Sequence, residues 1–339
     1  MISPLHRGMA LMAAIALIVA QVSLLSRGEP APASAAAADC GALAWATAER
    51  IQPVRNADAP PPPPVTAAAA VVVDGESGRV LYDLNAHERR APASTTKIMT
   101  AIVALEGVSE DMWVVSDING DEMVGSSIMG LRRGMYIQMR DLLYGLMLPS
   151  GNDAAVEIAK NTWGTEERFV EKMNEKVAEL GLGDTHFENP HGLDRREHYS
   201  TAYDLAMIGR YAMGNEEFRR IVASRVYELP RPIGYVLQNG NTLLNKYPGA
   251  DGLKIGWTDR AGWTLVASAT RDGHRVFVTV LDSEDRDADA SALLEWAFTT
   301  HQWKPVRSHI DVVMRIMRGI GRPAPLAMIA EACAVRATG

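Results

Sequence analysis

The chain of 339 residues is poor in cysteine and in aromatic residues. It holds 2 cysteines, and Phe, Trp and Tyr together make up 6% of its residues. A small disulfide framework and a zinc module built from clustered cysteines are therefore excluded. Cys40 and Cys333 lie near opposite ends of the chain. They could pair in an oxidising compartment or stay as two separate thiols, and we expect the second.

The chain also lacks a surplus of basic residues. Its 34 Lys and Arg residues against 41 Asp and Glu give a net charge of −7. This balance excludes a general nucleic-acid-binding protein, so we expect no nucleic-acid partner. The charge is uneven, because residues 301–339 carry +4 and the remainder carries −11. A basic tail on an acidic body indicates a separate partner for the tail.

A long, pure hydrophobic run is missing as well. The apolar stretch from Met9 to Leu25 covers 17 residues, and Gln21 and Ser23 interrupt it. It is short for a transmembrane helix, but a basic start and small residues after it are typical of an export signal. We expect residues 1–38 to be a cleaved signal peptide, with an uncleaved anchor as the alternative. Either way the body is exported, to the periplasm or the cell surface.

The rest of the chain divides into three parts. Residues 39–66 are rich in Ala and Pro and end in five prolines, which predicts an extended linker. Residues 67–302 have the composition of a folded domain, and residues 303–339 form the basic tail. No internal repeat is evident.

The predicted domain has strands near both ends and helices between them. Residues 67–84 and 262–282 each predict a β-hairpin, because alternating or β-branched runs flank a Gly-containing turn. Helical periodicity appears over residues 98–105, 142–148, 154–163, 166–180, 202–213 and 288–300. This order predicts an α/β (α+β) fold, in which an antiparallel sheet is closed by distant segments, flanked by helices and interrupted by a helical insertion.

Three short polar motifs stand in a fixed order along this domain. Ser94-Thr95-Thr96-Lys97 is followed 56 residues later by Ser150-Gly151-Asn152, and 104 residues after that by Lys254-Ile255-Gly256. Each motif alone is common by chance. In this order the set is typical of a serine acyl-transfer site whose base is a lysine.

The first motif pairs a nucleophile with a base. Ser94 and Lys97 are three residues apart at the start of a predicted helix, so they share one face. A serine needs a neighbouring base, and a lysine is a base only when it is neutral. Burial, the helix N-terminus and a second cation, Lys254, would all favour the neutral amine. The alternative is that Ser94 and Thr95 only cap the helix while Lys97 is solvated.

The other two motifs would hold the substrate. Ser150 and Asn152 lie on a connector between two predicted helices, where a hydroxyl could relay a proton and an amide could hold a carbonyl; helix capping by Asn152 or Asp153 is the alternative. Lys254 would supply a positive potential for a carboxylate. Gly256 would let a ligand backbone approach closely.

An oxyanion hole can also be predicted at this strand. The backbone N–H groups of Trp257 and Ser94 could form its two donors. A plain surface strand with an exposed lysine is the alternative for the third motif.

Taken together, the motifs resemble those of D-alanyl-D-alanine carboxypeptidases of the low-molecular-mass penicillin-binding type, over residues 67–300. The string Asn189-Pro190-His191-Gly192-Leu193, the following string His198-Tyr199-Ser200-Thr201-Ala202, and Arg286 carry the resemblance further. It implies a fold like that of DD-peptidases and β-lactamases.

The resemblance also implies an activity. A serine carboxypeptidase of this type would remove the terminal D-Ala from peptidoglycan stem peptides through an acyl-enzyme, and would bind β-lactam antibiotics. It implies catalytic roles for Ser94, Lys97 and Ser150. Substrate-binding roles fall to Asn152, Lys254, Gly256, Trp257 and Arg286. No cofactor or metal is expected, since His186, His191 and His198 are spaced too irregularly for a helical zinc motif.

Two features depart from the family pattern. Ile255 stands where the family usually has threonine, so a hydroxyl that would bind a carboxylate is missing. In addition, several family members carry a β-rich second domain after the catalytic one, and we do not expect one here, since 39 residues follow Thr300. Ile255 keeps a non-catalytic peptidoglycan-binding homologue as an alternative. A β-lactamase, and a D,D-endopeptidase that would share the same residues, are alternatives as well.

The basic tail has a helical pattern of its own. Over residues 306–322, apolar residues recur every three or four positions, and the opposite side is mainly arginine. This pattern predicts an amphipathic helix. It would bind an anionic membrane surface, which would make the protein peripheral on the cytoplasmic membrane, or it would pack on the folded domain.

Overall fold

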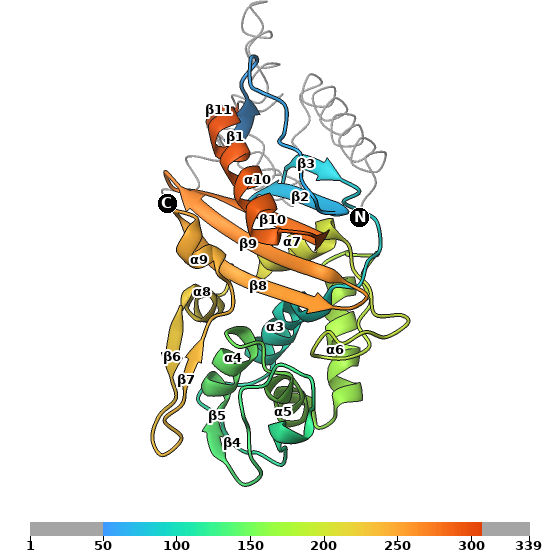
Figure 1. Cartoon of the computed structure of the whole chain (residues 1–339), viewed down its shortest axis with the longest axis vertical. Coiled ribbons are helices and arrows are strands. Elements are labelled where there is room, and N and C mark those ends of the chain that lie inside the picture. The colour runs from blue at the N-terminus through green and yellow to red at the C-terminus, as the bar shows by residue number, and fades with distance from the viewer. Residues whose placement is uncertain (1–49, 307–339) are drawn as a thin grey trace, which may run out of the picture. The chain divides into compact units, whose positions relative to one another are not determined.

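The computed structural model describes residues 50–306 (Figure 1). The signal peptide predicted over residues 1–38, both cysteines and residues 307–339 of the tail lie outside the described residues. The chain forms two compact units. Pro53–Gln302 is one, and Met1–Gln52 with Trp303–Gly339 is the other.

Two strands lie where the sequence did not predict them. Strand β1 (Arg50–Arg55) and strand β11 (His301–Val306) form a two-stranded sheet. The predicted linker, residues 39–66, therefore contains a strand, and Val306 is in a strand and not in the predicted amphipathic helix. Both strands are short runs interrupted by proline, and a run of this kind is a weak strand signal when its partner is about 250 residues away.

The central sheet has five antiparallel strands in the order β3-β2-β10-β9-β8 (Figure 1). Their bounds are β2, Ala69–Asp74; β3, Val80–Leu84; β8, Ala250–Thr258; β9, Gly262–Arg271; and β10, His274–Ser283. Ala69 pairs with Leu281 and Asp74 with Val276, so segments about 200 residues apart close the sheet, as predicted. Strand β8 is left at one edge.

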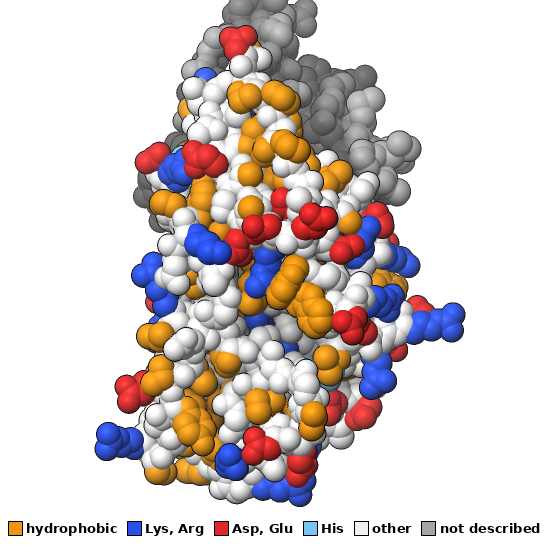
Figure 2. All heavy atoms as spheres, in the orientation of Figure 1, with side chains coloured by type: hydrophobic (Ala, Val, Ile, Leu, Met, Phe, Trp, Pro, Cys, Tyr) orange, Lys and Arg blue, Asp and Glu red, His pale blue; other side chains and the backbone are white. Residues whose placement is uncertain are grey.

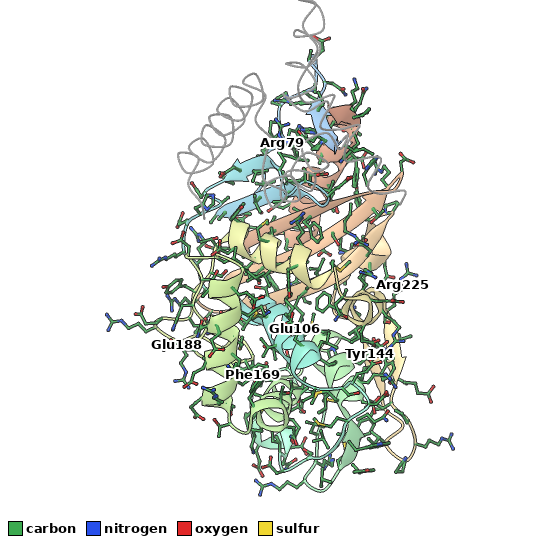
Figure 3. All side chains as sticks on the ribbon, turned by 180° about the vertical axis from the view of Figure 1, so that it is seen from behind. Arg79, Glu106, Tyr144, Phe169, Glu188 and Arg225 are labelled. Atoms are coloured by element: carbon green, nitrogen blue, oxygen red, sulfur yellow. The ribbon has the colours of Figure 1, made fainter. Side chains whose placement is uncertain are left out.

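A helix covers each face of this sheet. Helix α10 (Arg286–Thr300) crosses the front in Figure 1, and helix α7 (Ala202–Ala212) lies in front of the sheet in the view from behind in Figure 3. All six residues of β2 are buried, as are six consecutive residues of β10. Burial on both faces explains why these strands are nearly continuous runs of apolar and β-branched residues.

The helices between the two hairpins match the predicted ones to within a few residues. They are α3, Lys97–Gly107; α4, Met139–Met147; α5, Asn152–Trp163; and α6, Glu166–Glu179. Several short elements were not predicted: helices α8 (Glu216–Ala223) and α9 (Leu243–Lys246), and the strand pairs β4–β5 (Trp113–Val115 with Tyr136–Gln138) and β6–β7 (Val226–Glu228 with Val236–Gln238). Among the described residues, no helix is both long enough and apolar enough to cross a bilayer.

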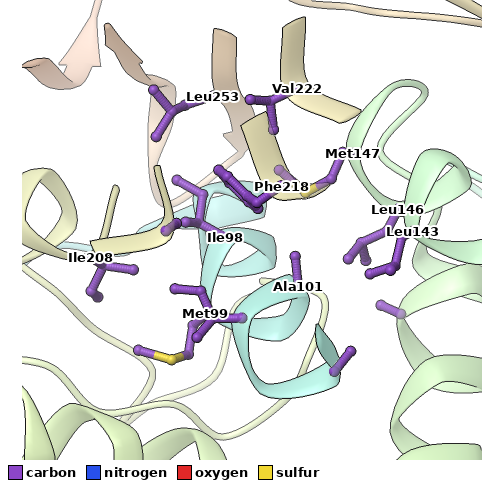
Figure 4. Close-up of a cluster of buried hydrophobic side chains, with 14 of the residues drawn as sticks. Ile98, Met99, Ala101, Leu143, Leu146, Met147, Ile208, Phe218, Val222 and Leu253 are labelled. Atoms are coloured by element: carbon purple, nitrogen blue, oxygen red, sulfur yellow. The ribbon is translucent and has the colours of Figure 1, made fainter. Parts of the chain in front are cut away.

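Helix α3 forms the centre of the helical part. Its first eight residues are all buried. Figure 4 shows Ile98, Met99 and Ala101 among side chains from α4, α7, α8 and β8. A helix that is apolar all round belongs in a core, and this one begins with a lysine. Packing of α3 therefore places the amine of Lys97 in a region without water.

Replacing Phe277 by alanine tests how far the α7 face of the sheet stabilises the fold. Phe277 is buried on β10, and its ring lies against Gly209 of α7. We expect Phe277→Ala to lower the free energy of unfolding by about 3–5 kcal/mol, measured by denaturant titration. Val124→Ala, at a residue that is 92% exposed, should leave it unchanged. A loss below about 1 kcal/mol for Phe277→Ala would contradict this packing.

Candidate active site

The three motifs meet where α3 begins beneath the edge strand β8. Ser94 lies in a short 3-10 turn, η1 (Ala93–Thr96), and Lys97 is the first residue of α3. Gly256 of β8 lies against this turn, because a Cβ atom there would be 2.8 Å from the backbone nitrogen of Ser94. Glycine at this position thus lets the strand approach the backbone of Ser94. Figure 2 shows Lys or Arg atoms at the bottom of a hollow on this face, beside a group of hydrophobic side chains.

The amine of Lys97 contacts three oxygens. Its Nζ atom is 3.0 Å from Ser94 Oγ, and it donates to Asn152 Oδ1 at 2.6 Å and to the main-chain oxygen of His191 at 2.6 Å. The side chain is fully buried. The alternative of a solvated Lys97 is therefore wrong. Neither turn nor helix has a side-chain cap, so capping by Ser94 and Thr95 is wrong too.

Burial holds the pKa of the Lys97 amine well below its ordinary value of 10.5. The positive charge of Lys254 lowers this pKa further, while Asp153 opposes the shift. Both named causes were expected from the sequence, since desolvation and a like charge each disfavour an ammonium group. The lowered pKa favours the neutral form of the amine, which is the form that can accept a proton.

The second motif holds Asn152 in one orientation. Its Oδ1 accepts from Lys97, and its Nδ2 donates to Ser126 Oγ at 2.6 Å. Ser150 is nearly buried beside it, with a φ of +68° that an L-residue rarely adopts. Strained backbone of this kind persists where surrounding contacts enforce it, often at functional sites.

Asp153 fixes the loop that carries Ser126. Its buried carboxylate accepts from the backbone N–H groups of Met129, Gly130 and Leu131 at 2.8–2.9 Å, as well as from Ala154. Capping of α5 by Asn152 is wrong, since both ends of its amide are used elsewhere. Asp153 accepts one hydrogen bond from its own helix, from the N–H of Ala154, but its three other hydrogen bonds come from residues 129–131 of the loop. The sequence analysis missed this role because nothing in the local pattern pairs residue 153 with residues 129–131.

The third motif contributes a second buried amine. Lys254 is 1% exposed, and its Nζ donates to the main-chain oxygen of Ile255 at 3.1 Å. Burial, followed by the nearby charge of Arg286, lowers the pKa of Lys254 to about 7. The exposed-lysine alternative is therefore wrong. Below about pH 7 this amine carries the positive charge that a substrate carboxylate would need.

Arg286 reaches the same strand from the first turn of α10. Its Nη1 donates to the main-chain oxygen of Gly256 at 3.3 Å, and its guanidinium lies 4.5 Å from the ring centre of Trp263. Trp257 is half exposed at the rim. The structure therefore brings all eight predicted site residues to one region around η1, the start of α5 and strand β8.

The loop over residues 189–193 packs against η1 and contacts the amine of Lys97. Asn189 Oδ1 accepts from the N–H groups of His191 and Gly192, which positions the His191 oxygen against Lys97. The ring of His198 accepts from Glu188 N–H and bonds Thr96 Oγ1, so its two nitrogens brace this loop against η1. Burial lowers the pKa of His198 to about 3, which keeps this ring neutral.

The model of the family described as D-alanyl-D-alanine carboxypeptidase (Peptidase_S11) matches residues 56–285. The chain belongs to this family. Among curated relatives, it is 35% identical over 253 residues to D-alanyl-D-alanine carboxypeptidase DacF of Bacillus subtilis, covering 72% of this chain and 65% of that one. It is 38% identical to DacD of Escherichia coli over 68% of this chain and 63% of that one. The chain thus spans a little under two thirds of these relatives' length.

Solved structures agree with this placement in the family. A D-alanyl-D-alanine carboxypeptidase from Mycobacterium tuberculosis superposes with a TM-score of 0.68 at 35% identity, covering 75% of this chain and 99% of that one. The Streptomyces K15 DD-transpeptidase gives a TM-score of 0.67 at 35% identity, covering 71% and 100%. The predicted DD-peptidase fold, with its antiparallel sheet and helical insertion, is confirmed.

Each motif of this family member has a left-handed residue at or just before it. Ala93 has a φ of +48°, Ser150 of +68° and Leu253 of +78°. A positive φ costs an L-residue on the order of 1–3 kcal/mol, so three of them in one site indicate backbone held in place by its surroundings. The sequence carries no signal for this strain, because glycine is the usual marker of positive φ and none of the three is glycine.

Gly192 offers a test of how closely the loop over residues 189–193 packs against the backbone of Ala93 and Ser94. It has a φ of +91°, and a Cβ atom there would lie 1.9 Å from the main-chain oxygen of Ala93. We expect Gly192→Ala to displace η1 and to slow acylation by penicillin on the order of 100-fold, as a misplaced reacting group does. Gly183→Ala, where a Cβ meets open space, is the matched control. Equal acylation rates for the two variants would show that the loop does not set the position of Ser94.

Proposed function

We propose that this protein is a serine-type D-Ala-D-Ala carboxypeptidase that removes the terminal D-Ala from peptidoglycan stem peptides and is acylated by β-lactams. The observation that carries the proposal is the buried amine of Lys97 lying 3.0 Å from Ser94 Oγ. The family match supports the substrate class, since its relatives bear that name.

The hydrogen bonds of Lys97 suit a neutral amine. A neutral amine has two N–H groups and one lone pair. The carbonyl oxygens of Asn152 and His191 can only accept, so they take both N–H groups. The lone pair then faces the hydroxyl of Ser94 and can take its proton. Lys97 is accordingly the general base in this proposal, and Ser94 is the nucleophile.

The remaining residues hold the substrate in place. The backbone N–H groups of Ser94 and Trp257 would donate to the developing oxyanion, because Gly256 brings the strand against η1. Lys254 and Arg286 would receive the terminal carboxylate. Asn152 Nδ2 has a second hydrogen beyond the one given to Ser126, and that hydrogen suits a substrate carbonyl.

The proton then has to reach the leaving amine. Ser150 is the residue we assign to this relay, between Lys97 and the departing D-Ala. Its hydroxyl belongs to a nearly buried side chain held at the entrance to α5. Water completes the cycle by hydrolysing the acyl-enzyme.

Two loop carboxylates bear on the β-lactamase alternative. Glu188 accepts from the N–H of Glu197, and Asp194 accepts from Thr258 Oγ1, and both side chains are exposed. Neither is engaged with Ser94, so neither supplies the base that rapid release of a penicillin fragment requires. This favours a carboxypeptidase with a persistent penicillin adduct.

The proposal also covers the roles of the parts of the chain and the location of the protein. We assign catalysis to residues 67–302, export to residues 1–38, and contact with an anionic membrane surface to residues 307–322 of the tail. Export suits a substrate that lies outside the cytoplasmic membrane. Membrane contact through the tail would keep the enzyme close to that substrate.

Intact-mass analysis tests the proposed chemistry. We expect benzylpenicillin to add one adduct to the wild-type protein, and Ser94→Ala to abolish it. Lys97→Arg should also abolish it with the fold retained, because a guanidinium does not deprotonate. Lys160→Arg, at a partly exposed lysine paired with Asp117, is the matched control and should acylate normally. An adduct that survives in Ser94→Ala, or forms at the wild-type rate in Lys97→Arg, would contradict the assignment.

A further inference from the structure

Arg286 is a cation with acidic neighbours on both sides in the sequence. Glu284 and Asp285 precede it, and Asp287 follows it in the first turn of α10. Among the described residues, its guanidinium nevertheless donates no hydrogen bond to a carboxylate, and its Nη1 donates to the main-chain oxygen of Gly256 instead. A cation that its own acidic neighbours leave in this state can receive a carboxylate from outside the protein.

Two of the three acidic side chains are engaged elsewhere. Asp285 Oδ1 accepts from the N–H of Ala288 at 3.0 Å and so caps α10. Asp287 Oδ2 accepts from Lys246 Nζ at 2.7 Å and from Thr242 Oγ1. These two donors belong to α9 and its N-cap, and α9 packs on β8 whereas α10 packs on β9 (Figure 1). A neighbouring helix, and not the adjacent guanidinium, therefore holds the carboxylate of Asp287.

The other oxygen of Asp287 lies close to Arg286 without bonding it. Asp287 Oδ1 is 3.9 Å from Arg286 Nε, which is beyond hydrogen-bond distance. This oxygen is buried, and in the part of the chain that the structure describes it has no hydrogen-bond partner. A buried acceptor without a donor is costly, and a shift of about 1 Å would give it one at Arg286. The bonds from α9 oppose that shift.

We infer that Lys246 and Thr242 hold the carboxylate of Asp287 away from Arg286, and that this restraint keeps the guanidinium free for the terminal carboxylate of the substrate. The inference rests on the proposed function, which gives Arg286 that ligand. An Asp287 side chain released from α9 would form a charge-assisted pair with Arg286, since both side chains are largely buried there. A substrate carboxylate would then have to displace that pair. Lys246 and Thr242 are positioning residues, because they act through Asp287.

Both positioning residues can be replaced without disturbing the core. The side chain of Lys246 is 60% exposed, and Thr242 is exposed as well. The hydroxyl of Thr242 caps no N–H of α9, so Thr242→Val removes no cap. The double variant Thr242→Val/Lys246→Ala therefore removes both hydrogen bonds to Asp287 Oδ2 and should keep the fold.

Two peptides that differ only at the terminal carboxyl group measure the effect. Both are diacetyl-L-lysyl-D-alanyl-D-alanine, one as the free acid and one as the terminal amide, and the ratio of their kcat/KM values reports the preference for a charged end. We expect Thr242→Val/Lys246→Ala to lower this ratio about tenfold, through a higher KM for the free acid. Cleavage of the amide should stay at the wild-type rate, which a general loss of structure would not allow. Lys160→Ala removes a lysine paired with Asp117 and is the matched control, with an unchanged ratio.

Asp287→Asn distinguishes a competing carboxylate from a supporting one. Added to the double variant, it should restore the ratio, because a neutral amide forms no ion pair with Arg286. Alone, it should leave the ratio at the wild-type value or above. The inference is overturned by an unchanged ratio in Thr242→Val/Lys246→Ala, by a lowered ratio that Asp287→Asn does not restore, or by a ratio that falls in Asp287→Asn alone.

The wild-type protein separates this inference from the function on which it rests. Failure to cleave either peptide, together with absence of a penicillin adduct, would overturn the proposed function. Equal cleavage of the free acid and the amide by a protein that does form the adduct would leave acyl transfer by Ser94 in place. That result would overturn the carboxylate-binding role of Arg286 and the inference with it.

Discussion

Burial of two lysine amines in one site is the constraint on which the rest of the structure depends. The amines of Lys97 and Lys254 contact neutral oxygens, namely the hydroxyl of Ser94 and the carbonyl oxygens of Asn152, His191 and Ile255. A buried ammonium without a carboxylate partner is costly, and the cost falls when the amine loses its proton. In the proposed mechanism, packing of this kind would produce the base, in place of the histidine that serine hydrolases commonly use. The all-round apolar surface of α3 is what takes the amine of Lys97 out of water.

The surrounding loops keep this arrangement from relaxing. Asp153 ties residues 129–131 to the start of α5, and the same loop presents Ser126 to the amide of Asn152. That contact orients the amide so that its oxygen faces Lys97. On the other side, Asn189 and His198 brace the segment whose carbonyl holds the amine. Rigid neighbours on both sides allow three residues of positive φ to persist at the motifs.

Much of the fold and site could be predicted from the sequence, for identifiable reasons. The hairpins and the long helices have strong periodicity, which predicts them directly. The order of the three motifs along the chain predicts that Ser94, Lys97 and Lys254 lie in one site. The strand pairs β4–β5 and β6–β7 have three residues in each strand, too few to show an alternation. Asp153 resembled an ordinary helix cap, since its three loop partners are 22–24 residues away. The contact of Trp263 with Arg286 could not be predicted, because it depends on how β9 and α10 are placed in the fold.

The protonation state of Lys97 tests the account most directly. A titration of its Nζ by ¹⁵N NMR, with the signal assigned by its loss in Lys97→Arg, reports that state in the wild-type protein. Because burial and the positive charge of Lys254 both lower the pKa, the amine should take up its proton only as the pH falls well below the ordinary value of 10.5. A signal that titrates near 10.5 would mean that Lys97 is charged at neutral pH, which would contradict its role as the base.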